Sequence, residues 1–368
     1  MRVKRLELLN YRNYKSLDLE FAGDTNIFYG DNAQGKTNIL EAVFVACTTK
    51  SHKKSRDQEI IGFSGEEAHI RLFLEKKGID YKIDMHLRKG RRKFAAINGV
   101  SVKKASELLG IANVVFFSPE DLNLIKSGPS ERRRFMDMEL CQLNRIYIDN
   151  LVKYNKCLEQ RNKLLKELSF GRVSENERDT LEIWEDQLIS YGIRIIEYRE
   201  RFTGELKDII RKNHSSLTGN NEYLELNYEP DVSIEDFAER LKGARKKDLK
   251  LCSTSVGPHR DDLSFFLEET DLRKYGSQGQ QRTAALSLKL SELELISNTI
   301  GDSPILLLDD VLSELDEHRQ GYLLDSIGGI QTLITCTGLE DFIRSRIRCN
   351  KTFRVTKGTV ETVIEESI

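Results

Sequence analysis

The fold class of this 368-residue chain is decided by one stretch, Gly30-Asp31-Asn32-Ala33-Gln34-Gly35-Lys36-Thr37. It matches the phosphate-loop pattern G-x-x-x-x-G-K-[ST] and stands between an apolar segment, residues 25–29, and a segment with helical spacing, residues 38–47. Glycines let backbone N–H groups turn toward phosphate oxygens, and the following helix adds the partial positive charge of its N-terminus. The stretch therefore predicts an ATP site in which all eight residues contact the nucleotide.

A second stretch supplies the acids that such a site needs. Residues 305–308 are apolar and are followed at once by Asp309 and Asp310. A buried strand would deliver Asp309 to a Mg²⁺ ion that Thr37 also binds, and would set Asp310 beside the γ-phosphate to polarise the attacking water. Lys36 would hold the β- and γ-phosphates, so we predict Lys36 and Asp310 as the catalytic pair. The alternative, a pair of acids that caps the next helix, is disfavoured by the phosphate loop upstream.

A third motif sets the class of ATPase. Ser277-Gln278-Gly279-Gln280 precedes an amphipathic helix, where a hydroxyl and N–H groups favour an anion. The order of phosphate loop, insertion, Ser-x-Gly-Gln and acid-ended strand is that of ABC-type ATPases, and residues 313–316 look like their D-loop. In that class the Ser-x-Gly-Gln segment faces the nucleotide of another copy. One phosphate loop and one such segment therefore predict an ATP-dependent homodimer, with residues 277–280 acting across its interface.

The middle of the chain differs in character from both ends. Apolar residues are spaced three and four apart along residues 181–202 and again along residues 147–168, with a polar segment, Gly171–Asp179, between them. This predicts an antiparallel helical hairpin, although both seams could equally be the buried faces of a compact helical subdomain. The predicted fold is α/β, an ABC-type head with an inserted α-helical arm. Residues 1–140 and 250–368 would form the discontinuous ATPase domain, and residues 141–249 the insertion.

Composition bounds the location and the partners. No apolar run reaches the length of a membrane span, no secretory signal is visible, and the six cysteines are scattered without a CxxC pair. We therefore expect a cytoplasmic protein with no membrane contact, and the cysteine spacing argues against a zinc site or a disulfide framework. A net charge of −2 does not indicate nucleic acid, but local basic clusters do. Unless they are merely solvated surface, the candidate duplex-DNA contacts are Lys53, Lys54, Arg56, Arg91, Arg92 and Lys93.

Five stretches from end to end of the chain narrow the class further. They are residues 9–14 (LNYRNY), 117–122 (FSPEDL), 129–137 (PSERRRFMD), 257–263 (GPHRDDL) and 275–282 (YGSQGQQR), and they resemble the RecF family of bacterial DNA-repair ATPases. The related SMC proteins share the ATPase motifs but insert hundreds of coiled-coil residues, for which this chain has no room.

The resemblance implies an ATP-dependent DNA-binding protein of recombinational repair of single-strand gaps, which supports replication restart and the SOS response. Such a protein binds duplex DNA near gap junctions, dimerises on ATP, hydrolyses ATP slowly under stimulation by DNA, and helps RecO and RecR to load recombinase. By resemblance to related ATPases, Arg12 and Asn13 would approach the nucleotide.

Two departures from transporter-type ATPases affect the expected rate of hydrolysis. The region after the acids has Thr335-Cys336-Thr337 where those enzymes place a histidine, and Asp310 stands where they have glutamate. Both favour an ATP-timed clamp over a fast hydrolytic engine. A transport-type ABC subunit remains the alternative function, and a small-molecule kinase would leave residues 277–280 without a role.

Overall fold

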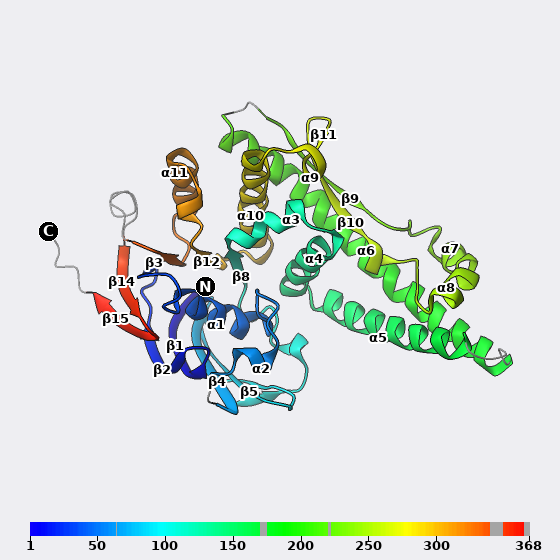
Figure 1. Cartoon of the computed structure of the whole chain (residues 1–368), viewed down its shortest axis with the longest axis horizontal. Coiled ribbons are helices and arrows are strands. Elements are labelled where there is room, and N and C mark those ends of the chain that lie inside the picture. The colour runs from blue at the N-terminus through cyan, green and yellow to red at the C-terminus, as the bar shows by residue number, and fades with distance from the viewer. Residues whose placement is uncertain (64, 170–174, 220–221, 339–348, 364–368) are drawn as a thin grey trace. The chain divides into compact units, whose positions relative to one another are not determined.

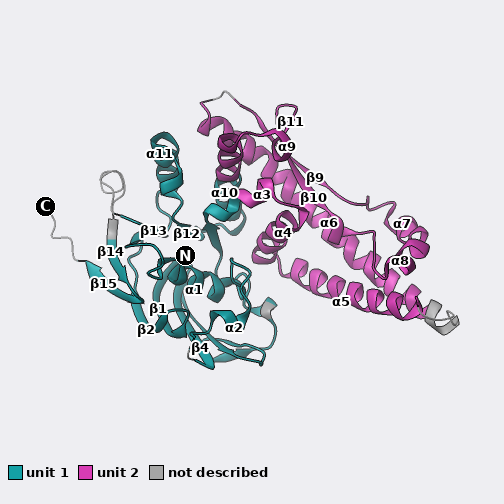
Figure 2. Ribbon diagram, viewed as in Figure 1, with its two compact units in different colours: residues 1–121, 288–368 teal, residues 122–287 magenta. Residues whose placement is uncertain are grey.

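The structure is a computed structural model that describes residues 1–63, 65–169, 175–219, 222–338 and 349–363 (Figure 1). The chain forms two compact units (Figure 2). Unit 1 comprises residues 1–121 and 288–368, and unit 2 comprises residues 122–287.

Unit 1 holds a mostly parallel sheet whose strand order is β15-β14-β3-β13-β12-β8. All neighbouring pairs are parallel except β14 and β15. Its central strands are largely buried, and the apolar residues Ile305–Leu308 of β12 are fully buried, as is typical of parallel strands covered on both faces. The strands are β3 (Thr25–Tyr29), β8 (Val114–Phe117), β12 (Ile305–Asp309), β13 (Thr332–Cys336), β14 (Cys349–Thr356) and β15 (Thr359–Val363).

A second, antiparallel sheet of unit 1 has the order β2-β1-β4-β5-β6-β7. Its strands alternate, with residues such as Leu8, Ile70 and Met85 buried and their neighbours facing outward. The strands are β1 (Arg2–Tyr11), β2 (Tyr14–Glu20), β4 (Glu67–Lys76), β5 (Ile79–Arg88), β6 (Phe94–Ile97) and β7 (Val100–Val102).

One helix, α1 (Lys36–Thr48), joins the two sheets because it contacts strands of both. Almost every residue of α1 is buried, because both sheets pack against the helix. This burial explains why the sequence of α1 is mostly apolar. Among its described residues, unit 1 also contains the α-helices α2 (Asp57–Ile60), α11 (Glu317–Ser326) and the second half of α10 (Gln278–Ile300), whose first half belongs to unit 2. Short 3₁₀ turns lie at Ala105–Glu107, Pro119–Asp121 and Leu312–Glu314.

Unit 2 is built on a long helical hairpin. Helix α5 (Arg145–Leu168) runs antiparallel to α6 (Glu175–Leu217), since Tyr147 meets Tyr198 near one end of the pair while Arg161 meets Glu185 toward the other. The predicted hairpin is confirmed, and residues 171–174 of its predicted polar turn lie outside the described residues. The remaining elements are α3 (Leu122–Lys126), α4 (Pro129–Leu143), β9 (Leu224–Glu229), α7 (Phe237–Gly243), α8 (Arg245–Leu251), a 3₁₀ turn (Pro258–Arg260), β10 (Asp262–Leu267), β11 (Thr270–Asp271) and α9 (Leu272–Tyr275).

The boundaries of the compact units differ from the predicted ones. The prediction cut the chain after residues 140 and 249, whereas the units change at residues 121 and 287. Helix α4 packs on β10, where Arg132 Nε lies 2.6 Å from Asp262 Oδ1, and β10 pairs with β9, which packs on α6. These long-range contacts tie the segments that flank the hairpin to the hairpin itself. The seam of α6 is thus also the buried face of a compact subdomain, the alternative that the sequence left open.

Buried charges hold unit 2 together. Arg199 is almost fully buried and pairs with Asp137 at 2.8 Å and with Asp261 at 2.7 Å. Its neighbour His259 lies with Nδ1 2.6 Å from the Tyr154 hydroxyl and with Nε2 3.0 Å from the Thr254 carbonyl oxygen. Burial lowers the pKa of His259, so the ring is neutral and acts as a structural hydrogen-bonding group.

Candidate nucleotide site

The phosphate loop connects the buried strand β3 to the N-terminus of α1. Gly30 has a φ of 147° and Gly35 has a φ of 115°, backbone angles that residues other than glycine rarely adopt. A Cβ atom would lie 2.4 Å from the Val355 carbonyl oxygen at Gly30, and 2.4 Å from Asn13 Nδ2 at Gly35. Both glycines of the motif are therefore required by close packing of the loop as well as by its turns.

Lys36 folds back over the loop that it follows. Its Nζ donates to the carbonyl oxygens of Gly30, at 2.5 Å, and Asp31, at 2.8 Å. Burial lowers the pKa of Lys36, and the negative charges of the acidic strand end, Asp310 first, oppose that shift. The Lys36 ammonium group is thus held beside the loop by two carbonyl contacts that phosphate oxygens can replace.

The two predicted Mg²⁺ ligands lie in direct contact. Thr37 Oγ1 donates to Asp309 Oδ1 at 2.7 Å, and Thr335 Oγ1 donates to the same oxygen at 2.8 Å. Neighbouring oxygens of an octahedral Mg²⁺ shell, each at 2.0–2.1 Å, lie about 2.9 Å apart. The separation of the Thr37 and Asp309 oxygens and their hard-oxygen chemistry therefore fit Mg²⁺.

Asp310 has an unusual backbone. Its φ is 54°, and its N–H is held by Thr335, with the carbonyl oxygen at 3.2 Å and the hydroxyl oxygen at 3.0 Å. Its Oδ1 is buried and has no hydrogen-bond partner among the residues that the structure describes. A buried carboxylate oxygen without a partner costs about 1–3 kcal/mol. This oxygen therefore fits a position that meets a water molecule or the ligand of the site.

Sequence reasoning missed Thr335 and the turn of the β14–β15 hairpin. Gln34 of the loop accepts at Oε1 from the Lys357 N–H, at 2.7 Å, and at its carbonyl oxygen from the Gly358 N–H, at 3.1 Å. Asn13 Nδ2 also donates to the Gln34 carbonyl oxygen, at 2.9 Å. Lys357 and Gly358 form the turn of this hairpin, and nothing in the local sequence indicates their contact with a loop over 300 residues away.

Arg12 and Asn13 diverge despite being neighbours. Asn13 touches the phosphate loop, whereas the Arg12 guanidinium grips Glu41 of α1, with Nη2–Oε1 at 2.7 Å and Nε–Oε2 at 2.8 Å. Burial acts to raise the pKa of Glu41, but hydrogen bonds from Arg12 and Ser51 outweigh it, so the pKa is lowered. The hydrogen bonds of Arg12 thus brace α1, whereas those of Asn13 reach the phosphate loop.

The same Glu41 ties the basic segment, residues 50–56, to α1. Ser51 Oγ donates to Glu41 Oε1 at 2.5 Å, and His52 stacks on Phe116 with ring centroids 3.9 Å apart. Lys93 Nζ donates to the Thr49 carbonyl oxygen at 2.5 Å and to Asp57 at 2.9 Å. This bond brings the two predicted basic clusters together. Lys93 itself is half-buried and paired, while the exposed candidates are Lys53, Lys54, Arg56, Arg91 and Arg92.

In unit 2, the Ser-x-Gly-Gln segment begins α10 with reciprocal hydrogen bonds. Ser277 Oγ accepts from the Gln280 N–H at 3.2 Å, and Gln280 Oε1 accepts from the Ser277 N–H at 3.0 Å. Ser277, Gln278 and Gly279 are exposed, and a Cβ at Gly279 would meet nothing closer than 4.0 Å. The segment therefore presents an open helix N-terminus.

Comparisons with known proteins give the family. The profile described as "RecF/RecN/SMC N terminal domain" matches residues 2–360. The chain is 56% identical over 365 residues to the "DNA replication and repair protein RecF" of Agathobacter rectalis, covering 99% of this chain and 100% of that protein. It is 57% identical over 360 residues to the protein of the same description from Lachnospira eligens, covering 98% and 99%. The chain belongs to the RecF family.

Solved structures agree with this family. One described as "Structure of the recombination mediator protein RecF-ATP in RecFOR pathway" superposes with a TM-score of 0.92 at 37% identity, covering 99% of this chain and 98% of that one. An Smc head domain at 16% identity and a TM-score of 0.57, covering 99% and 97%, shows the shared fold alone. The predicted ABC-type ATPase head is confirmed. Within the described parts of the chain, no helix is both long and apolar enough to cross a membrane.

Proposed function

We propose that this RecF-family chain is an ATP-dependent DNA-binding protein that acts as a clamp or switch in the recombinational repair of single-strand gaps. One observation carries the proposal. The phosphate loop, the acidic strand end and the Thr37–Asp309 contact occur together in a chain that matches the RecF relatives from end to end. That match also disfavours a transport-type ABC subunit.

The site residues divide the chemistry among themselves. Lys36 exchanges its two carbonyl contacts for β- and γ-phosphate oxygens, and residues 30–37 wrap the phosphates. Mg²⁺ held by Thr37 and Asp309 would neutralise phosphate charge. Asp310 orients and polarises the attacking water through its buried Oδ1. Aspartate at this position, one methylene shorter than glutamate, suits slow hydrolysis that DNA stimulates.

A homodimer completes each site. The chain has one phosphate loop and one exposed helix N-terminus at Ser277–Gln280, and the N-terminal dipole of α10 suits a γ-phosphate. ATP bound by one subunit would therefore be covered by the Ser277–Gln280 segment of a second copy. Asn13 supports the loop from within the same chain.

DNA is the proposed macromolecular ligand. The exposed cations of residues 50–56 and 88–93 lie near one another because Lys93 joins the two segments, and Ser51 and Arg12 connect the first segment to α1 through Glu41. The contacts of these cations with duplex phosphates near gap junctions would therefore depend on whether a nucleotide is bound at the N-terminus of α1. Similar chains are described as a recombination mediator of the "RecFOR pathway". We accordingly propose RecR and RecO as partners in loading recombinase in the cytoplasm, with roles in replication restart and the SOS response.

Binding of duplex DNA at two salt concentrations tests the proposal, without nucleotide, with ADP, and with a non-hydrolysable ATP analogue, while light scattering records the oligomeric state. The analogue alone should produce a dimer and tight, salt-sensitive DNA binding. Lys36→Met is the matched control, and with the analogue it should neither dimerise nor bind DNA tightly. An analogue-induced dimer that does not bind DNA would sink the DNA proposal while leaving the nucleotide site intact.

A further inference from the structure

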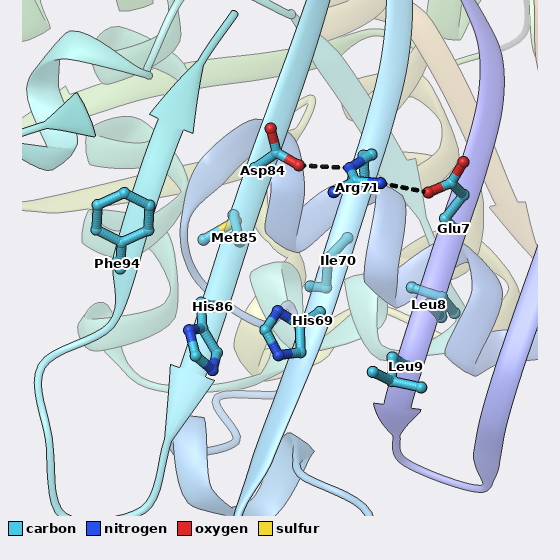
Figure 3. Close-up of a pocket in the computed structure, with 10 residues that line it drawn as sticks. All are labelled: Glu7, Leu8, Leu9, His69, Ile70, Arg71, Asp84, Met85, His86 and Phe94. Atoms are coloured by element: carbon cyan, nitrogen blue, oxygen red, sulfur yellow. Dashed lines mark hydrogen bonds and ion pairs between the residues drawn. The ribbon is translucent and has the colours of Figure 1, made fainter. Parts of the chain in front are cut away.

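Two histidines and a glutamate cluster on the outward face of the antiparallel sheet of unit 1. His69 of β4 and His86 of β5 are cross-strand partners whose rings stack with centroids 3.9 Å apart. Figure 3 shows the two rings next to each other among the residues that line a groove. The groove has a volume of about 460 Å³. Glu67 lies two residues before His69 on the same face of β4. The nucleotide site uses none of the three.

The donor atoms of this cluster already have nearly the spacing that a metal ion requires. His86 Nε2 lies 3.0 Å from Glu67 Oε2, His69 Nε2 lies 3.8 Å from Glu67 Oε1, and all three ligand atoms lie within 4.8 Å of one another. Tetrahedral Zn²⁺ at 2.0–2.1 Å from each donor sets donors about 3.3 Å apart. Of the three ligands, the half-exposed His69 ring would have to rotate to bring its nitrogen to that distance.

A cation already occupies part of this position. Arg88 Nε lies 3.2 Å from Glu67 Oε2 and 3.2 Å from His86 Nε2, so the guanidinium sits where an ion would bridge the carboxylate and the imidazole. The Arg88 side chain is 46% exposed and can move away into solvent. The groove beside the histidines leaves open coordination positions for water or a further ligand.

We propose that Glu67, His69 and His86 form a surface site for a divalent transition-metal ion, with Zn²⁺ as the best match. Imidazole nitrogens with one carboxylate suit Zn²⁺ rather than Mg²⁺. The cysteine count of the sequence could not indicate it, because the ligands are histidine and glutamate on two strands. The bound ion joins β4 to β5 and stabilises the sheet on which the basic hairpin of residues 88–93 is mounted.

Titration of the full-length, metal-free and nucleotide-free chain with ZnCl₂ against a chromophoric chelator tests the site. We expect one equivalent of Zn²⁺ per chain, and a rise of roughly 5 °C in the unfolding midpoint at a hundredfold excess over Kd. His86→Gln should weaken binding by at least about tenfold and reduce the rise by about half or more. His318→Gln changes an exposed histidine of α11 and should leave both Zn²⁺ binding and the rise in the unfolding midpoint unchanged.

Two further variants make the test specific. Arg88→Gln should tighten Zn²⁺ binding several-fold, because it removes the competing cation, whereas weaker binding would overturn the proposal. Zn²⁺ binding that survives His69→Gln and His86→Gln but is lost in Asp309→Asn would also overturn it, by assigning the ion to the nucleotide site. Retained binding of an ATP analogue by His86→Gln shows that this variant is folded.

Discussion

Replacement of Thr335 with valine tests how the acidic strand end is held. The Thr335 hydroxyl donates to Asp309 Oδ1 at 2.8 Å and accepts from the Asp310 N–H at 3.0 Å, and Thr335 is fully buried. Valine has nearly the same shape but neither bonding capacity. Each buried polar group that loses its partner costs about 1–3 kcal/mol.

The expected loss of stability is smaller than the sum of two such penalties. Asp309 Oδ1 keeps the Thr37 hydroxyl, and the Asp310 N–H keeps the Thr335 carbonyl oxygen at 3.2 Å. We therefore expect Thr335→Val to lower the free energy of unfolding by about 1–3 kcal/mol in total. The Mg²⁺ site should suffer more, because groups that orient a metal ligand typically change metal affinity about 10–100-fold.

The assay is DNA-stimulated ATP hydrolysis as a function of Mg²⁺ concentration, with thermal unfolding measured in parallel. Thr335→Val should raise the half-saturating Mg²⁺ concentration roughly tenfold or more. Thr335→Ser keeps the hydroxyl and should remain close to wild type. Unchanged Mg²⁺ dependence in the valine variant, or equal impairment of valine and serine, would refute the positioning role.

Other variants probe the surrounding contacts. Asp310→Asn should bind ATP and dimerise but hydrolyse at least about a hundredfold more slowly, and hydrolysis at the parental rate would disprove its catalytic role. Gly358→Ala adds a Cβ 2.6 Å from the Asn13 carbonyl oxygen at a φ of 77°, so it should weaken ATP binding in a nucleotide titration. The lowered pKa of Glu41 contributes stability that is present above its unfolded pKa near 4.5 and is lost as pH falls below that value. Acid unfolding should therefore show a smaller pH dependence in Glu41→Gln, which should itself be less stable at pH 7, and equal pH profiles would contradict this. Charge reversal of the exposed Arg91 and Arg92 should reduce DNA affinity and its salt dependence while leaving ATP binding intact, and normal DNA binding would remove this hairpin from the interface.

The sequence alone determined those parts of the protein whose chemistry lies in contiguous residues. A phosphate loop needs its glycines, lysine and threonine in one turn, so residues 30–37 were identifiable without a structure. The apolar residues before Asp309 predicted a buried strand that ends in two acids, and the heptad spacing predicted the α5–α6 hairpin. In each case the local pattern and the final structure obey the same short-range constraint.

Tertiary structure decided whatever depends on residues that are distant in the chain. Thr335 contacts the two acids because parallel pairing places β13 beside β12, with Thr335 opposite Asp309. The sequence near residue 335 does not indicate this register. The contact of Gly358 with Gln34 and the antiparallel pairing of β10 with β9 likewise join residues that are far apart in the sequence. Arg12 and Asn13 are adjacent in sequence but have different partners, Glu41 of α1 and the Gln34 carbonyl oxygen of the phosphate loop. Side-chain direction and strand register are set by packing across the whole fold, which a local pattern does not contain.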